Sequence, residues 1–153
     1  MKKRWKIIST LLILSGLWIG FISSISEKKN PIESEEKNMK ENLSINVNGS
    51  VFKIILEANA TSEALKNMLP LKITMKELNG NEKYFDLEKS LPANPARVEK
   101  IEAGDIMLYE KDCLVIFYED FKTSYSYTRI GKIENIEGLK KALGLDNVEV
   151  EIY

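Results

Sequence analysis

The chain has 153 residues, in which 22 lysines and arginines nearly balance 23 aspartates and glutamates, for a formal net charge of −1. It contains no histidine and one cysteine. These counts exclude histidine acid–base catalysis, histidine metal sites, an intramolecular disulfide and cysteine-rich zinc sites.

The charges are unevenly distributed along the chain. Lys2, Lys3, Arg4 and Lys6 are the only charged residues among the first 26, which leaves 18 basic and 23 acidic groups, a net charge of −5, to residues 27–153. An acidic body of this kind disfavours a nucleic-acid partner.

Residues 1–26 are typical of an export signal, because the cationic start is followed by a 20-residue uncharged run from Ile7 to Ser26. A run of this length can cross a bilayer as one helix, so we expect an uncleaved membrane anchor. The alternative is secretion after cleavage near Ser26, since Ser24 and Ser26 are small residues at the positions that a signal peptidase reads. In both cases the cations stay in the cytoplasm and the body is exported.

Residues 27–42 are predicted to form a flexible tether. Nine of these sixteen residues are charged, and only Pro31, Ile32 and Met39 are apolar. Such a segment cannot bury enough apolar surface to offset the entropy of ordering it.

Residues 43–153 are predicted to form one β-rich domain. Asn48-Gly49 and Asn79-Gly80 are strong signals for tight hairpin turns. Alternating or β-branched patterns predict eight strands, at residues 43–47, 51–57, 71–76, 82–87, 105–109, 113–118, 127–133 and 148–152.

Two short amphipathic helices are expected between the strands. The first would be capped by Thr61, present Ala64, Leu65, Met68 and Leu69 on one face, and stop at Pro70. The second would be capped by Asn135, carry Leu139, Ala142 and Leu143, and stop at Gly144. Eight strands suffice to close a small antiparallel β-barrel whose open ends the helices cover, and a β-sandwich is the alternative architecture.

The sequence contains no recognisable catalytic or cofactor motif. Cys113 opens an apolar strand and is predicted to be a small buried side chain rather than a nucleophile. No calcium-binding loop and no glycine-rich phosphate loop are present. We therefore predict no cofactor and no metal site.

Residues 117–129 form an unusual stretch with five aromatic side chains and several hydroxyls. Aromatic rings with polar tips suit recognition of a peptide or a small apolar ligand, and an arginine adds a fixed fork of donors. The candidate ligand-binding residues are Phe117, Tyr125, Tyr127 and Arg129. In the alternative interpretation, alternate aromatics fill the barrel and the others lie in a solvated loop.

Several blocks resemble the bacterial cyclophilin-like fold proteins. These blocks, which stand in the same order as in that family, are residues 69–71, 79–84, 103–109, 112–118 and 124–131. The resemblance implies an eight-stranded barrel with two helices over residues 43–153, in agreement with the strand count.

The resemblance implies less about activity. True cyclophilins are peptidyl-prolyl cis-trans isomerases that use an arginine after a Phe-His pair, and this chain has neither a histidine nor that motif. Arg129 is the one candidate donor for a prolyl amide. We expect a membrane-tethered binding module for a peptide or small apolar ligand, with a divergent prolyl isomerase and a structural cell-envelope protein as alternatives. The oligomeric state is left open.

Overall fold

The computed structural model describes residues 43–153; the predicted anchor at 1–26 and tether at 27–42 lie outside the described residues and stay predictions. The described part contains two helices, α2 (Ala60–Lys66) and α3 (Leu139–Leu143). Its strands are β1 (Leu43–Val47), β2 (Ser50–Leu56), β3 (Leu71–Leu78), β4 (Glu82–Asp86), β5 (Ala96–Arg97), β6 (Lys100–Ile101), β7 (Asp105–Tyr109), β8 (Cys113–Phe117), β9 (Phe121–Lys122), β10 (Ser126–Ile133) and β11 (Val148–Ile152).

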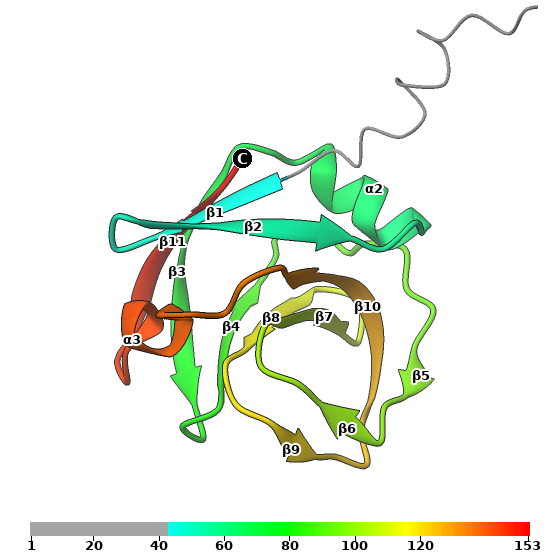
Figure 1. Ribbon diagram of the computed structural model, residues 1–153. Coiled ribbons are helices and arrows are strands. Elements are labelled where there is room, and N and C mark those ends of the chain that lie inside the picture. The colour runs from blue at the N-terminus through cyan, green and yellow to red at the C-terminus, as the bar shows by residue number, and fades with distance from the viewer. Residues whose placement is uncertain (1–42) are drawn as a thin grey trace, which may run out of the picture.

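Eight of these strands close into an antiparallel barrel (Figure 1). The order around the wall is β2-β1-β11-β3-β4-β8-β7-β10, and pairing of β10 with β2 joins the last strand to the first. These are the eight strands predicted from the sequence, so the barrel is confirmed and the sandwich alternative is wrong.

The two predicted hairpin turns are confirmed. Asn48, Gly49, Asn79 and Gly80 all have positive φ angles, between 48° and 82°. Two successive positive φ angles match the right-handed twist of the flanking strands, which is why Asn-Gly is favoured at such turns.

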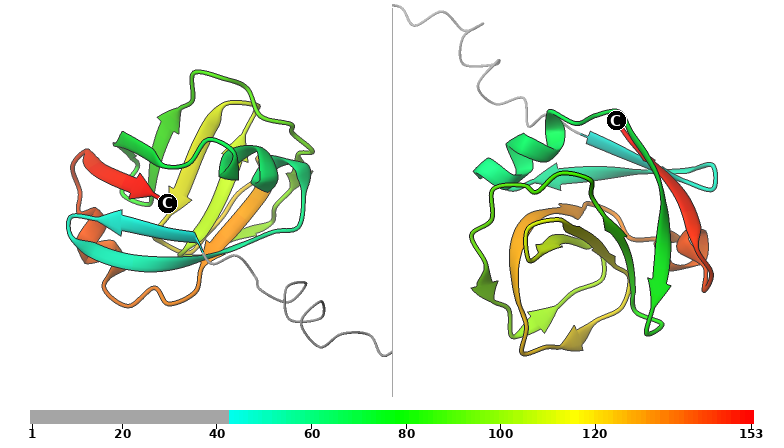
Figure 2. Two further views of the ribbon diagram at one scale, coloured as in Figure 1. Left: turned by 90° about the horizontal axis from the view of Figure 1, so that it is seen from above. Right: turned by 180° about the vertical axis from the view of Figure 1, so that it is seen from behind.

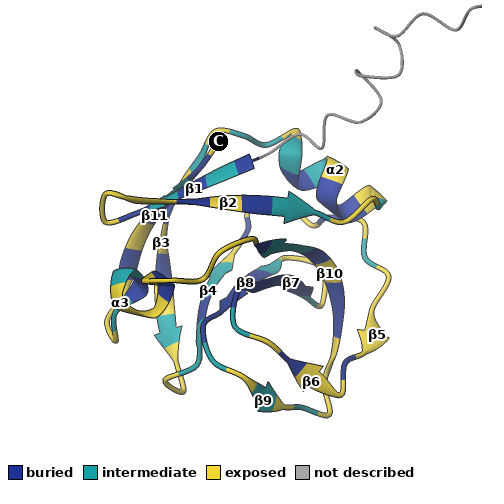
Figure 3. Ribbon diagram, in the orientation of Figure 1, coloured by how far each residue is buried: buried dark blue, intermediate teal, exposed yellow. Residues whose placement is uncertain are grey.

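Buried residues recur along the barrel strands (Figure 3), and their side chains form one apolar cluster inside the barrel. We call this set the inner core. Both helices contribute to it, through Leu65 of α2 and through Leu139 and Leu143 of α3.

The predicted start of each helix is wrong. Asn59 caps α2, because its side-chain oxygen accepts a hydrogen bond from the backbone N–H of Ser62 at 2.9 Å. The hydroxyl of Thr61 instead donates to the carbonyl of Pro92 at 2.6 Å. Helix α3 begins only after Gly138, and Asn135 accepts from the N–H of Glu137 within the preceding turn. Gly144 ends α3 as predicted.

Helix α2 is also shorter than predicted. It ends at Lys66, four residues before Pro70. Met68 and Leu69, which were expected on its apolar face, follow the helix and pack against the inner core while remaining partly exposed.

Three two-residue strands were not predicted, and they build a layer outside the barrel. Strand β5 pairs with the start of β10, and β6 pairs with β9 (Figures 1 and 2). Strand β5 extends the edge of the main sheet, and the separate β6–β9 pair covers the outer surface of β8, β7 and β10 through Ile101 and Phe121. These strands are too short to leave a periodic signal in the sequence.

Candidate functional site

One part of the barrel wall is buried on both faces. Along β8, Leu114 and Ile116 point into the inner core, whereas Val115 and Phe117 point outward, as strand alternation requires. The outward side chains join a second apolar group, which we call the outer cluster. Its buried members are Val98, Ile101, Met107, Val115, Phe117 and Tyr127.

Aromatic rings in and around the outer cluster pack edge to face. The rings of Phe117 and Tyr127 lie 5.6 Å apart at 90°. Tyr109 contacts Tyr127 at 5.7 Å and Tyr125 at 6.0 Å, the latter at 84°. This tilted geometry is the favoured one for aromatic pairs, so the rings hold one another in fixed orientations.

A cavity of about 430 Å³ opens beside the outer cluster; we call it the tyrosine pocket. Strand register builds its floor, because Tyr84 is paired with Val115 and Asp86 with Cys113, which in turn is paired with Tyr109. The complete lining is Leu78, Asn79, Glu82, Tyr84, Asp86, Tyr109, Glu110, Asp112, Cys113, Val115, Tyr125 and Tyr127.

The tyrosine pocket is acidic. Four carboxylates and no lysine or arginine line it; the four are Glu82, Asp86, Glu110 and Asp112. Burial, reinforced by the negative charge of Glu77, raises the pKa of the half-buried Glu82 carboxyl above its usual value. The pocket thus combines aromatic walls with uncompensated negative charge.

Cys113, which was predicted to be buried, is only partly buried and lines the pocket. Burial and the neighbouring carboxylate of Asp86 raise the pKa of the thiol to about 12. A thiol that stays protonated at neutral pH is a poor nucleophile. The site therefore has no activated cysteine.

The structure brings only part of the predicted site together. Tyr125, which is 60% exposed, and Tyr127, which is 6% exposed, both line the tyrosine pocket. Phe117 is fully buried in the outer cluster and supports Tyr127 without reaching the cavity. Arg129 does not line this pocket; it borders a second cavity of about 460 Å³, which Tyr127, Arg97 and Pro92 also line.

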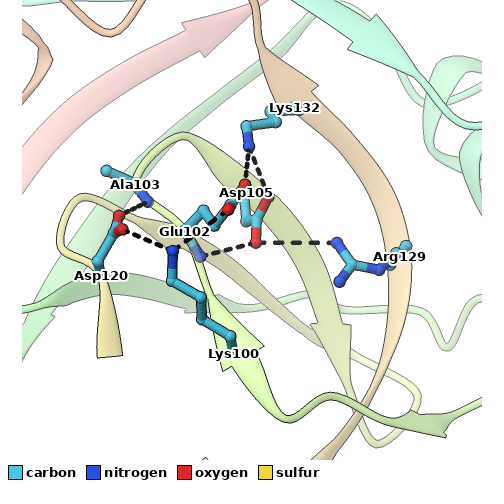
Figure 4. Close-up of polar contacts among 7 residues, drawn as sticks. All are labelled: Lys100, Glu102, Ala103, Asp105, Asp120, Arg129 and Lys132. Carbon is cyan, nitrogen blue, oxygen red and sulfur yellow. Dashed lines mark hydrogen bonds and ion pairs between the residues drawn. The ribbon is translucent and has the colours of Figure 1, made fainter. Parts of the chain in front are cut away.

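Arg129 belongs to a network of charged side chains (Figure 4). Its guanidinium lies 3.8 Å from the carboxylate of Asp105, which is buried and accepts a hydrogen bond from the N–H of Glu102 at 3.0 Å. Lys132 approaches Asp105 at 3.7 Å and donates to the Glu102 carboxylate at 2.6 Å. The guanidinium is thus partly neutralised by a buried carboxylate.

The other contacts of the network stabilise the turn before β7. Lys100 lies 3.1 Å from the carboxylate of Asp120, which also accepts from the N–H of Ala103 at 2.9 Å. The hydrogen bond from Ala103 and the ammonium of Lys100 hold the pKa of Asp120 below its usual value. These contacts join the β6–β7 turn to the segment between β8 and β9, which is a structural role.

Sequence reasoning missed most of the pocket. Tyr84, Glu82 and Asp86 come from β4, far from the aromatic stretch in sequence, and Tyr109 comes from β7, just before it. The available signal was strand alternation, which puts residues 82, 84 and 86 on one face. The β4–β8 pairing that brings this face to Cys113 and Tyr109 joins strands distant in sequence.

Comparison with known proteins agrees with this architecture. The chain matches the Cyclophilin-like family over residues 45–153. The chain belongs to this family. No curated protein is significantly similar to it in sequence.

Solved structures similar to the cyclophilin-like domain include the solution structure of the hypothetical protein AF2241 from Archaeoglobus fulgidus. The two share 23% sequence identity with a TM-score of 0.50, over 72% of this chain and 92% of that one. This likeness bears on the fold alone. Within residues 43–153 of the cyclophilin-like protein, no helix is long and apolar enough to cross a membrane.

Proposed function

We propose that this cyclophilin-like barrel is a binding module whose tyrosine pocket takes a small molecule or a segment of a peptide. The observation that carries the proposal is the pocket itself. About 430 Å³ is within the usual size of small-ligand sites, and four tyrosines give it rigid walls with polar tips. Tyr125, more than half exposed at the rim, is available to a ligand.

Binding fits the chemistry of the pocket better than catalysis does. The thiol of Cys113 is neutral, and the lining has carboxylates and phenols but no cation to stabilise a developing negative charge. Arg129, the donor considered for prolyl isomerisation, borders the other cavity and is drawn toward Asp105. A prolyl-peptide isomerisation assay with the full chain separates the two functions, and we expect the uncatalysed rate.

The first prediction concerns Tyr125. We expect short peptides or small apolar compounds from a thermal-shift library to raise the melting temperature of the full chain, and Tyr125→Ala to abolish that rise while melting normally without ligand. The reason is that Tyr125 forms one exposed wall of the pocket.

Tyr153→Ala is the matched control, since Tyr153 is also exposed and lies outside the pocket lining. Ligand shifts that persist in Tyr125→Ala, or a library without any hit, would argue against the binding function.

The proposal also includes the location of the barrel. We infer that residues 1–26 anchor the chain in a membrane and that residues 27–42 tether the barrel outside the cytoplasm. The cationic start and the 20-residue uncharged run support this location. An exported binding module would meet its ligand outside the cytoplasm.

A further inference from the structure

We propose that the tyrosine pocket selects a small organic cation, a ligand that carries a substituted ammonium group. This inference rests on the proposed function, because it names the chemical class of the ligand for that same pocket. Its basis is the combination of aromatic rings and unpaired carboxylates around one cavity.

The rings provide the first half of a cation site. Tyr84, Tyr109, Tyr125 and Tyr127 line the cavity, and the Tyr109 and Tyr125 rings meet edge to face rather than stacked. The edge of one ring in this pair covers a face of the other, and the ring faces that still border the cavity are electron-rich surfaces that attract an ammonium group. One lining ring already makes such a contact, since the ammonium of Lys76, which does not line the cavity, lies 5.6 Å from the centre of the Tyr84 ring; Tyr109, Tyr125 and Tyr127 make no such contact with a lysine or arginine within residues 43–153.

The carboxylates provide the second half. Within residues 43–153, none of the four carboxylates that line the pocket forms an ion pair with a lysine or arginine. The raised pKa of Glu82 indicates the cost of keeping its charge in a half-buried position beside Glu77. A bound cation would supply the missing counter-charge.

Other ligand classes fit this pocket less well. An anion would meet the repulsion of Glu82, Asp86, Glu110 and Asp112. A neutral apolar molecule would cover Glu82 without pairing its charge, and burial of an unpaired charge is unfavourable. A substituted ammonium satisfies both halves of the site, since its apolar groups contact the rings while its charge faces the carboxylates.

The test compares two probes of nearly identical shape. Choline carries a trimethylammonium group, and 3,3-dimethyl-1-butanol has a neutral tert-butyl group in the same position. We expect calorimetric titration of the full chain to give a dissociation constant about tenfold lower for choline. Equal affinity for the two probes would overturn the cation inference while leaving the binding function intact.

A pair of double variants locates the selectivity. Glu82→Gln with Asp86→Asn should weaken choline about tenfold and leave the neutral alcohol unchanged. Glu63→Gln with Glu149→Gln removes the same charge from exposed positions outside the pocket and should change neither affinity. An equal loss of choline binding in both double variants would show that net charge, and not this pocket, attracts the cation.

The two proposals fail in different ways. If library compounds bind at Tyr125 but choline does not bind to the unmodified chain, the cation inference is wrong and the binding function stands. If neither choline nor any library compound binds, both are wrong.

Discussion

At the scale of single residues, the most unusual position is Lys83, a lysine without solvent exposure. Its ammonium forms an ion pair with Glu77 and donates to the carbonyl of Asp146 at 2.7 Å. Glu77 is held in turn by the Tyr118 hydroxyl at 2.9 Å and by the N–H of Gly80 at 2.8 Å. The buried ammonium thus has two hydrogen-bond acceptors, and the Tyr118 ring lies 5.4 Å from it, so its charge is compensated inside the protein.

The second prediction removes the partner of this lysine. Glu77→Gln should lower the free energy of unfolding by about 3 kcal/mol at pH 7, because it leaves the Lys83 ammonium buried without a counter-charge. Urea unfolding followed by circular dichroism measures the loss. Glu149→Gln, which breaks an exposed ion pair with Lys72, is the matched control and should change little.

Glu77→Gln should also change how the stability of the protein depends on pH. Burial works to raise the pKa of Glu77, but hydrogen bonds from Lys83, Tyr118 and Gly80 outweigh it and hold the pKa below its usual value. Glu77 therefore stabilises the fold above about pH 4.5, and this contribution is lost as the pH falls and the carboxylate protonates. We expect unmodified protein and variant to converge in stability at low pH; a constant difference would contradict the assignment.

At the scale of elements, β10 determines how the barrel closes. It pairs with β5, β7 and β2 in succession, and its register against β7 shifts between Arg129 and Gly131. Helix α2 packs at this irregularity, where the Ser62 hydroxyl donates to the Ile130 carbonyl at 2.7 Å and the Asn59 amide donates to the Arg129 carbonyl at 2.8 Å. The Ile130 carbonyl also accepts from the N–H of Glu57 at 2.9 Å, so the helix adds hydrogen bonds to the strand where its register is irregular.

The third prediction concerns Gly131, at the seam between β10 and β2. A Cβ at this position would lie 2.5 Å from the carbonyl oxygen of Ile55, which is backbone and cannot swing away. Gly131→Ala should therefore destabilise the protein by about 1–3 kcal/mol, measured by thermal unfolding.

Ser126→Ala is the control, because Ser126 is an exposed residue at the other end of β10. Equal melting temperatures for Gly131→Ala and the unmodified chain would mean that β2 moves aside without cost.

The barrel strands were easier to predict from the sequence than the helix ends or the pocket. The eight barrel strands were predictable because alternation and Asn-Gly turns are local signals. The helix caps were not: Thr61 and Asn135 are good capping residues, but Thr61 donates to the distant carbonyl of Pro92 and Asn135 accepts within the turn that precedes α3. The pocket was predicted only at Tyr125 and Tyr127. Glu82 and Tyr84 join them through the pairing of β4 with β8, strands far apart in the chain, whereas Tyr109 comes from the β7–β8 hairpin.

At the scale of the whole molecule, the fourth prediction concerns the predicted anchor at residues 1–26. We expect cell fractionation to recover the full-length chain with the membranes, and protease added outside the membrane to digest the barrel, because the 20-residue uncharged run from Ile7 to Ser26 is long enough to span. A shortened band in the soluble fraction would instead support cleavage near Ser26.

The double-sided burial of the wall has a consequence for the unfolded chain. Strand β8 lies between β4 and β7, and residues 113–118 read Cys-Leu-Val-Ile-Phe-Tyr without a charge. Uncharged segments rich in β-branched and aromatic residues are the ones that stack into amyloid-like fibrils. Asp112 before the segment and Glu119-Asp120 after it oppose such stacking by charge repulsion. The barrel wall and the outer cluster therefore also sequester an aggregation-prone strand, and variants that loosen either are expected to precipitate as well as unfold.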